Sequence, residues 1–261
     1  MEITYISNEG FMLKTENKGV LIDSLHRGEY PPYDLIKPHV LEQMQKAGEP
    51  FDNIDLILFT HHHYDHFDPY STILHLSNNS KVKLVAPPQI QNILQEHFSE
   101  IYDLVEGQIN SCLPKLYTSE SMNFDGINLK IYHVPHGEYL VMDEITGERV
   151  NKHATVQHLM FIISIGGKKI LHIGDTVPNE DKRSIEPYKE MIEEQIDLAF
   201  LSSWFVIDSK GIEIIKKYIK PEHIVVMHLE SEEKNQISRD VSKSIQSKIT
   251  IFDNSMDSII I

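Results

Sequence analysis

The feature that most constrains this chain is a cluster of histidine and aspartate residues that directly follows an apolar run, within residues 56–68. The apolar run predicts a buried strand. Side chains alternate along an extended segment, so His61 and His63 project to one side and can bind one metal ion together. Asp65 and His66 follow where the chain must turn into a helix, within reach of a second ion. An exposed polar loop would account for consecutive histidines alone, but the whole cluster predicts a binuclear metal site at a strand end.

The spacing of this cluster resembles that of the metallo-β-lactamase superfamily, whose members carry His-x-His-x-Asp-His at the end of a buried strand. Residues 61–66 have the motif residue at every fixed position. The resemblance implies an α/β fold, a four-layer αββα sandwich with two mixed sheets. The chain length favours a single domain over residues 1–261. Through Gly174-Asp175-Thr176 and Met227-His228, the chain most resembles the branch that contains the ascorbate-phosphate lactonase and the N-acyl-phosphatidylethanolamine phospholipase D.

Three further ligand-type residues stand at the ends of apolar strands: His136, Asp175 and His228. Open α/β sheets present their sites at the carboxyl ends of strands, so we expect these residues to meet the histidine cluster. The resemblance implies that His61, His63 and His136 hold one ion, that Asp65, His66 and His228 hold the other, and that Asp175 bridges the two. His158 competes with His136 as the third ligand. His172 is expected to pack or hydrogen-bond within its sheet.

The predicted cofactors are two divalent metal ions, with zinc expected and manganese or iron as alternatives. Two such ions can share a water and lower its pKa to about 7, so a metal-bridged hydroxide is the expected nucleophile. Asp65 and Asp175 are the expected catalytic residues. Asp23, at the end of an apolar strand, is expected to orient a ligand imidazole, with a simple strand-end turn as the alternative. These features predict a metal-dependent hydrolase of a small ester, lactone or phosphodiester.

Aromatic and imidazole side chains are expected around the substrate. Trp204 and Phe205 follow a buried strand and are predicted to form a substrate wall, with core packing as the alternative. The predicted substrate-binding residues are Trp204, Phe205, Tyr139 and His158. The candidates for proton donor to the leaving group, with loop or core packing as the alternative, are Tyr64, Tyr139, His153 and His158.

The composition narrows the class of partner. With 39 acidic and 24 basic residues the formal charge is −15, which disfavours nucleic acid and favours a small-molecule substrate. Cys112 is the only cysteine, so the ligands must be mainly histidine and aspartate. No signal peptide or membrane span is visible, so a cytoplasmic protein is expected. The oligomeric state is not predicted. The alternative functions are a non-catalytic metal-binding or regulatory protein of the same fold and an RNA-processing phosphodiesterase.

The residue pattern also predicts an alternation of strands and helices. The predicted strands are residues 3–6, 11–14, 20–23, 82–86, 127–134, 156–165, 169–173, 197–201, 224–228 and 258–261. The predicted helices are residues 38–47, 70–76, 88–98, 187–195 and 211–219. Residues 138–155 are expected to form a loop or lid, and residues 101–116 carry no assignable pattern.

Overall fold

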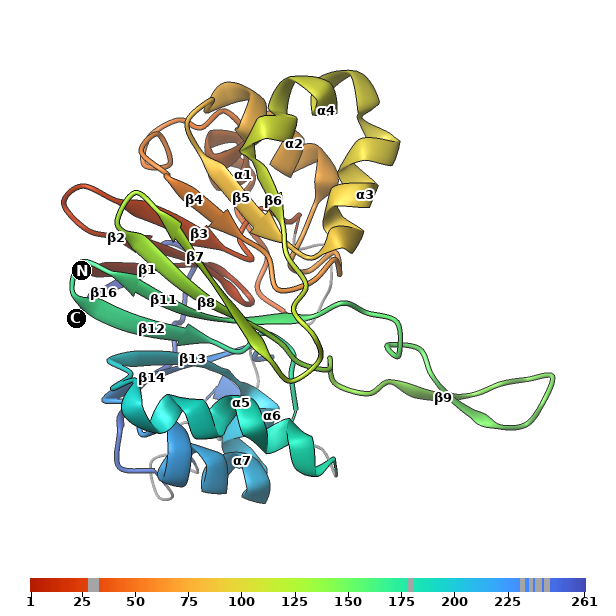
Figure 1. Cartoon of the computed structure of the whole chain (residues 1–261). Coiled ribbons are helices and arrows are strands. Elements are labelled where there is room, and N and C mark those ends of the chain that lie inside the picture. Colours follow the sequence, from red (N-terminus) through yellow and green to blue (C-terminus); the bar gives the residue numbers. More distant parts are fainter. Residues whose placement is uncertain (28–32, 178–180, 231–232, 235–236, 238–240, 242–244) are drawn as a thin grey trace.

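The computed structural model describes residues 1–27, 33–177, 181–230, 233–234, 237, 241 and 245–261. In this part of the chain two seven-stranded mixed sheets pack face to face, and helices cover the outer face of each (Figure 1). The predicted α/β sandwich of four layers is therefore confirmed.

The first sheet has the strand order β16-β1-β2-β3-β4-β5-β6. Its strands are β16 (Ser258–Ile260), β1 (Glu2–Ser7), β2 (Gly10–Lys14), β3 (Gly19–Ile22), β4 (Leu56–Leu58), β5 (Lys83–Ala86) and β6 (Ile109–Ser111). The first three strands of the chain form an antiparallel meander, and β3 to β6 run parallel. The carboxyl ends of β1, β3 and β4 therefore lie at the same edge of this sheet.

The second sheet has the strand order β15-β14-β13-β12-β11-β8-β7. Its strands are β15 (Lys248–Thr250), β14 (His223–Met227), β13 (Leu198–Ser202), β12 (Lys168–His172), β11 (Leu159–Ile165), β8 (Ile127–His133) and β7 (Ser119–Phe124). The strands β12 to β15 are parallel, and β11 is antiparallel to both β8 and β12. As a result β8, β12, β13 and β14 all end at one edge.

The alternation of side chains along the strands divides the apolar core into two layers. In β3, Val20 and Ile22 belong to the cluster that fills the space between the sheets, whereas Leu21 packs under the helices of the first sheet. In β4, Leu58 faces the second sheet and Ile57 faces the helices. Both faces of these strands are thus buried, as their near-continuous apolar sequence predicts.

The outer faces of the sheets carry helices from two separate parts of the chain (Figure 1). The first sheet is covered by α1 (Pro38–Gln45), α2 (Pro69–Asn78), α3 (Pro88–His97) and α4 (Ser99–Val105). The second is covered by α5 (Glu186–Lys189), α6 (Ser203–Ile207) and α7 (Ser209–Ile214), which continues as a π-helical turn (Ile215–Ile219). Asp68 begins α2, because its carboxylate accepts a hydrogen bond of 2.7 Å from the Ser71 amide and Pro69 occupies the first turn.

Some predicted elements differ from those observed. The predicted helix at residues 187–195 is shorter, because α5 gives way to a 3-10 turn (Glu190–Glu193). Residues 101–116, which had no assignment, contain the end of α4, a 3-10 turn (Glu106–Gln108) and β6. The strand β7 was not predicted, because most of its residues are polar, as suits an exposed edge strand.

Residues 138–155 form an arm and not a plain loop. Within it β9 (Leu140–Met142) pairs with β10 (Arg149–Asn151), and this hairpin extends away from the sandwich (Figure 1). Its tip is open to solvent, since Ile145 is 95 % exposed. No helix among the described residues is long and apolar enough to cross a membrane.

Candidate metal centre

The histidine cluster lies in a tight turn between β4 and α2. The amides of His66 and Phe67 both donate to the carbonyl of His63, at 3.0 and 2.8 Å, so the chain reverses immediately after the third histidine. This turn brings His66 back beside His61, with 4.0 Å between ring centroids. The sequence spacing therefore places four ligand-type side chains within one short turn.

The second sheet brings three more ligand-type residues to the same place. His136 follows β8, Asp175 follows β12 and His228 follows β14, so each lies just past the carboxyl end of its strand. His136 Nε2 is 3.3 Å from Asp175 Oδ2, and His228 Nε2 is 3.5 Å from Asp65 Oδ2. Residues far apart in the sequence thus meet where the two sheets face each other.

Two groups of side chains could each hold an ion. The ligand atoms within each group lie no more than 4.8 Å apart: His61, His63, His136 and Asp175 in one, and Asp65, His66 and His228 in the other. Asp175 also reaches the second group, because its Oδ1 is 3.4 Å from His66 Nε2. The seven side chains that the resemblance implies as ligands are therefore together, with Asp175 between the two groups.

The donor set fits a metal ion because several of its buried ligand atoms lack a hydrogen-bond partner. His61 Nε2, His66 Nε2, His136 Nε2 and Asp175 Oδ1 are all buried and make no hydrogen bond to any described residue. Buried polar atoms without partners cost free energy, and their convergence on one point indicates a bound cation.

The other ring nitrogens are held in place by hydrogen bonds. His61 Nδ1 lies 3.0 Å from Thr60 Oγ1, and His136 Nδ1 donates to the carbonyl of Gly137 at 2.7 Å. His66 Nδ1 donates to Asp23 Oδ2 at 3.0 Å. Such partners fix the orientation and tautomer of a ligand imidazole, so each Nε2 is presented to the centre.

Asp23 links the two strand ends beneath the cluster, in the position expected for a residue that orients a ligand. Its carboxylate accepts hydrogen bonds from the Thr60 amide at 2.8 Å and the Thr60 hydroxyl at 2.6 Å, in addition to the one from His66. Its φ of 44° lies in the left-handed region, as do those of Asn8 at 50° and His228 at 54°. Unfavourable backbone conformations gathered at one place are a mark of functional sites.

His158, the alternative third ligand, lies behind the centre. Its Nε2 accepts a hydrogen bond of 2.9 Å from the amide of Asp175, so this atom is already used. Gly174 makes that contact possible, because its φ is 56° and an added Cβ would lie 2.5 Å from His158 Nε2. The geometry favours His136 as the third ligand, and His158 holds the loop that carries Asp175.

Burial and neighbouring charges set the ionisation of the centre. Burial lowers the pKa of His61 and lowers that of His63 to about 3. Burial opposes ionisation of Asp65, but His66 and His228 outweigh it and lower the pKa of this carboxyl to about 2. Burial likewise opposes protonation of His66, yet Asp175 and Asp65 raise its pKa well above the usual value. Binding of an ion through His66 Nε2 must therefore displace a proton.

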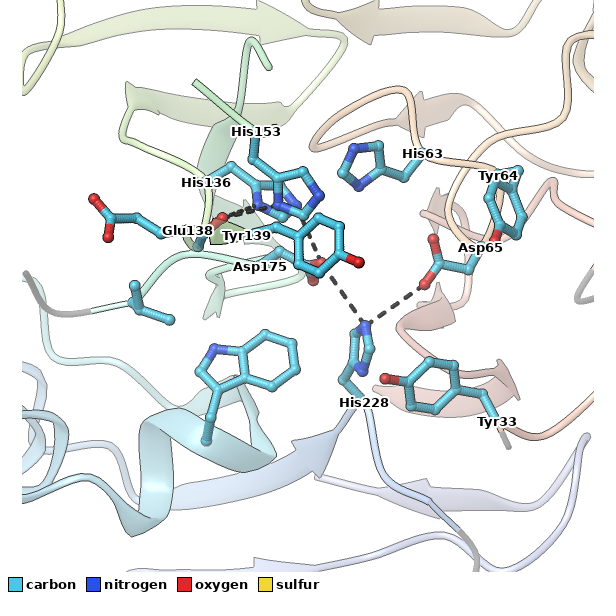
Figure 2. A pocket seen from close by; sticks show the side chains of 13 residues that line it. Tyr33, His63, Tyr64, Asp65, His136, Glu138, Tyr139, His153, Asp175 and His228 are labelled. Atoms are coloured by element: carbon cyan, nitrogen blue, oxygen red, sulfur yellow. Dashed lines mark hydrogen bonds and ion pairs between the residues drawn. The ribbon is translucent and has the colours of Figure 1, made fainter. Parts of the chain in front are cut away.

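The centre opens into a cavity of about 740 Å³. Figure 2 shows Asp175, His136 and His228 turned toward one another, with the ring of Tyr33 next to His228. The residues that line it are Tyr33, His63, Tyr64, Asp65, His136, Gly137, Glu138, Tyr139, His153, Asp175, Val177, Trp204 and His228. This volume suits a small-molecule ligand.

Only part of the predicted substrate wall lies at the cavity. Trp204 and Tyr139 line the cavity, as do the proton-donor candidates Tyr64 and His153. Phe205 does not, because it is 0 % exposed and packs 5.8 Å from Tyr188 in the core. His158 is also fully buried and does not line the cavity. Neither side chain reaches the cavity.

Two residues of the centre were missed in the sequence. Glu9 is fully buried, with Oε1 accepting from Ser202 Oγ at 3.2 Å and Oε2 lying 3.7 Å from His66 Nδ1. Burial, and to a lesser degree repulsion from the Asp175 carboxylate, raises the pKa of Glu9 well above its usual value. Tyr33 lines the cavity, with its ring 4.3 Å from that of His228. Both stand in polar or proline-rich segments that read as exposed turns.

His172 lies within its sheet, as expected. Its Nε2 donates to the carbonyl of Glu9 at 3.1 Å, and its Nδ1 accepts from the Gly174 amide at 3.3 Å. Both ring nitrogens are thus satisfied by the backbone.

Comparison with known families identifies the fold and its site together. A family profile described as the β-lactamase superfamily domain matches residues 20–245, which include all seven ligand-type residues. The chain belongs to this superfamily. The predicted resemblance to the metallo-β-lactamase superfamily is confirmed, while the narrower branch stays a prediction.

Relatives within the superfamily are similar over most of their length. A UPF0173 metal-dependent hydrolase from Polynucleobacter asymbioticus is 25 % identical over 240 residues, covering 88 % of this chain and 74 % of the relative. A second, from Saccharolobus solfataricus, is 26 % identical and covers 85 % of this chain and 80 % of the relative. Among solved structures, a metallo hydrolase from the archaeon Ignicoccus hospitalis has a TM-score of 0.61 at 17 % identity, covering 99 % of this chain and 97 % of that one. The structural likeness supports the fold alone.

Proposed function

We propose that the protein is a metal-dependent hydrolase that binds two divalent ions and cleaves a small ester, lactone or phosphodiester. The observation that carries this proposal is the set of buried ligand atoms that make no hydrogen bond to any described residue and lie beside an open cavity. The relatives named as metal-dependent hydrolases support it. Zinc suits the imidazole-rich donor set, with manganese or iron as alternatives.

Two ions bound at this centre would supply hydroxide at neutral pH and polarise the bond to be broken. The chain itself fixes the geometry. Asp175 lies between the two groups of ligands and would hold the ions at a constant separation. Asp65 is held by contacts to His228 and to the Asn8 side-chain amide, which donates to it at 3.3 Å. Both carboxylates are thereby fixed before substrate arrives.

The leaving group also needs a proton, and His153 is placed to give it. Its Nδ1 donates to the carbonyl of Gly137 at 2.9 Å, which leaves Nε2 to carry the transferred proton. Asn151 Oδ1 accepts from the amides of both Tyr139 and His153, each at 3.0 Å. The base of the arm thus positions two proton-donor candidates at the cavity wall.

Turnover measurements can also distinguish two other functions. A non-catalytic metal-binding protein needs only a closed site with four ligands, whereas this centre opens to a cavity. An RNA-processing phosphodiesterase would need to attract a polyanion, which the formal charge of −15 disfavours.

The test compares turnover with matched variants. Lactone, thioester and bis(p-nitrophenyl) phosphate substrates are incubated with zinc-loaded protein, with and without a chelator. The His228→Asn variant removes a proposed ligand. His223→Asn makes the same change at the other end of β14, where the imidazole bonds Thr250. We expect chelator-sensitive turnover that falls at least about 100-fold in His228→Asn and stays near the parent level in His223→Asn. Absence of turnover, or turnover that the chelator leaves intact, would contradict the proposal.

A further inference from the structure

The charges of the cavity wall differ sharply from those of a site for anions. Apart from Asp65 and Asp175 in the centre itself, Glu138 is the only acidic side chain among the described lining residues, and no lysine or arginine lines the cavity in the described chain. The described wall beyond the metal centre therefore carries one carboxylate and neither lysine nor arginine.

Of the basic side chains close in sequence to lining residues, Lys152 directly precedes His153 but does not line the cavity, and two others are paired elsewhere. Lys234 bonds Asp34 at 2.8 Å and is 12 % exposed. Arg183 pairs with Asp181 at 2.7 Å and stacks on the ring of Tyr117, with 5.2 Å from Cζ to the ring centroid. Neither lines the cavity, so neither supplies the charge that carboxylate or phosphate recognition normally requires.

Aromatic rings supply most of the remaining wall. The rings of Trp204 and Tyr33 pack against His228, with centroids 4.6 and 4.3 Å away. The Tyr139 ring lies 5.5 Å from that of His153, at the base of the arm. Faces of this kind attract apolar groups and cations and repel anions.

We propose that the cavity accepts a compact apolar or cationic group on the part of the substrate beyond the reacting bond, and discriminates against an anionic one. The inference rests on the proposed hydrolase function, because bound ions would neutralise charge at the reacting bond only. The remainder of the substrate meets aromatic rings, Val177 and Glu138. Among esters, lactones and phosphodiesters, the cavity therefore favours substrates with a neutral or positively charged tail.

The test uses three thioacetates that share one reacting bond and differ in the charge of the tail. The tails are 2-(trimethylammonio)ethyl, its uncharged carbon isostere 3,3-dimethylbutyl, and 3-sulfopropyl. Hydrolysis adds water across the thioester to give acetate and a thiol, and the thiol is measured. We expect kcat/KM for the cationic tail to equal or exceed that for the neutral tail. Both of these kcat/KM values should exceed that for the anionic tail by about tenfold or more.

Glu138→Lys gives the inference a direct perturbation. The ratio of kcat/KM for the anionic tail to that for the neutral tail should rise by about tenfold, because the lysine replaces repulsion with attraction. The matched control is Glu144→Lys, which makes the same change near the exposed tip of the arm and should leave the ratio unaltered. A parent enzyme that hydrolyses the sulfopropyl ester as fast as the neutral one would overturn the inference while leaving the hydrolase function intact.

A binding measurement separates failure of this inference from failure of the proposed function. Trp204 is the only tryptophan in the chain and lines the cavity, so intrinsic fluorescence reports binding there without any reaction. The probes are choline, 3,3-dimethylbutan-1-ol and 3-hydroxypropanesulfonate. If no thioester is hydrolysed, the thioesterase form of the proposed function fails, and the order of affinities still decides the inference. Tighter binding of the sulfonate than of choline would refute it.

Discussion

Replacing Asp23 by asparagine tests whether the residue beneath the centre controls the ligands above it. Asp23→Asn preserves the shape of the side chain and the acceptor for the Thr60 amide. The new amide group instead faces His66 Nδ1 and the Thr60 hydroxyl, where a carboxylate oxygen now accepts from both. His66 must then present a lone pair at Nδ1 and carry its proton on Nε2, the atom directed at the centre.

The expected effect follows from these contacts. Loss of a partner that orients a metal-bound imidazole typically costs 10–100-fold in affinity, which is about 1.4–2.7 kcal/mol. The metal-free protein should also lose about 1.5–3 kcal/mol of unfolding free energy, because a buried, charge-assisted hydrogen bond is removed. Zinc affinity is measured by competition with a chromophoric chelator, and stability by urea unfolding.

Asp197→Asn is the matched control. Asp197 accepts from Lys168 Nζ at 2.7 Å and from the Lys169 amide at 2.8 Å, at the opposite end of the sheet from the centre. This variant should lose stability but keep the zinc affinity of the parent. If Asp23→Asn also bound zinc within twofold of the parent, the argument that this carboxylate fixes the tautomer of His66 would be refuted.

Three further outcomes follow from the structure. Gly174→Ala should lower the free energy of unfolding by about 1–3 kcal/mol, because the backbone is left-handed and the new methyl meets His158 Nε2; urea unfolding checks this, and parental stability would contradict it. Burial lowers the pKa of His75 to about 4, so the unfolded chain binds more protons and stability is lost as pH falls from about 6.5 through 4. His75→Gln should remove about 1.4 kcal/mol per pH unit from that slope in the metal-free protein, and an unchanged slope would argue otherwise. Burial, aided by Glu120, raises the pKa of the Cys112 thiol to about 12, so a thiol reagent at pH 8 should modify it only in denaturant, and rapid reaction of the native protein would be inconsistent with this.

The strand ends were predictable because apolar runs reveal buried strands and parallel strands end together. Asp175 and His228 each follow such a run, so the sequence alone brings them to one edge of the second sheet, and His61 follows another run at the end of a strand in the first. Glu9 carries no such signal, since a glutamate between asparagine and glycine is typical of a solvent-exposed turn. Its burial depends on the second sheet, where Ser202 bonds it.

The errors have equally local causes. Trp204 and Phe205 are adjacent in sequence, but both lie in α6, where successive side chains point about 100° apart around the helix. Trp204 therefore faces the cavity and Phe205 faces the core. The sequence does not indicate which side of this helix is directed at the cavity. His158 precedes β11, so it reaches the correct edge, but only the structure reveals that its Nε2 is used by the Asp175 amide.

The seven ligand-type residues come from both sheets of the sandwich. His61, His63, Asp65 and His66 follow a strand of the first sheet, while His136, Asp175 and His228 follow strands of the second. Ions bound by this set would cross-link the two sheets at the edge where the ligands meet. At a free metal concentration of 1,000 times the dissociation constant, such a cross-link would add about 4.1 kcal/mol to the free energy of unfolding. Supply of metal in the cell would then govern how much folded protein persists as well as how much reaction it performs.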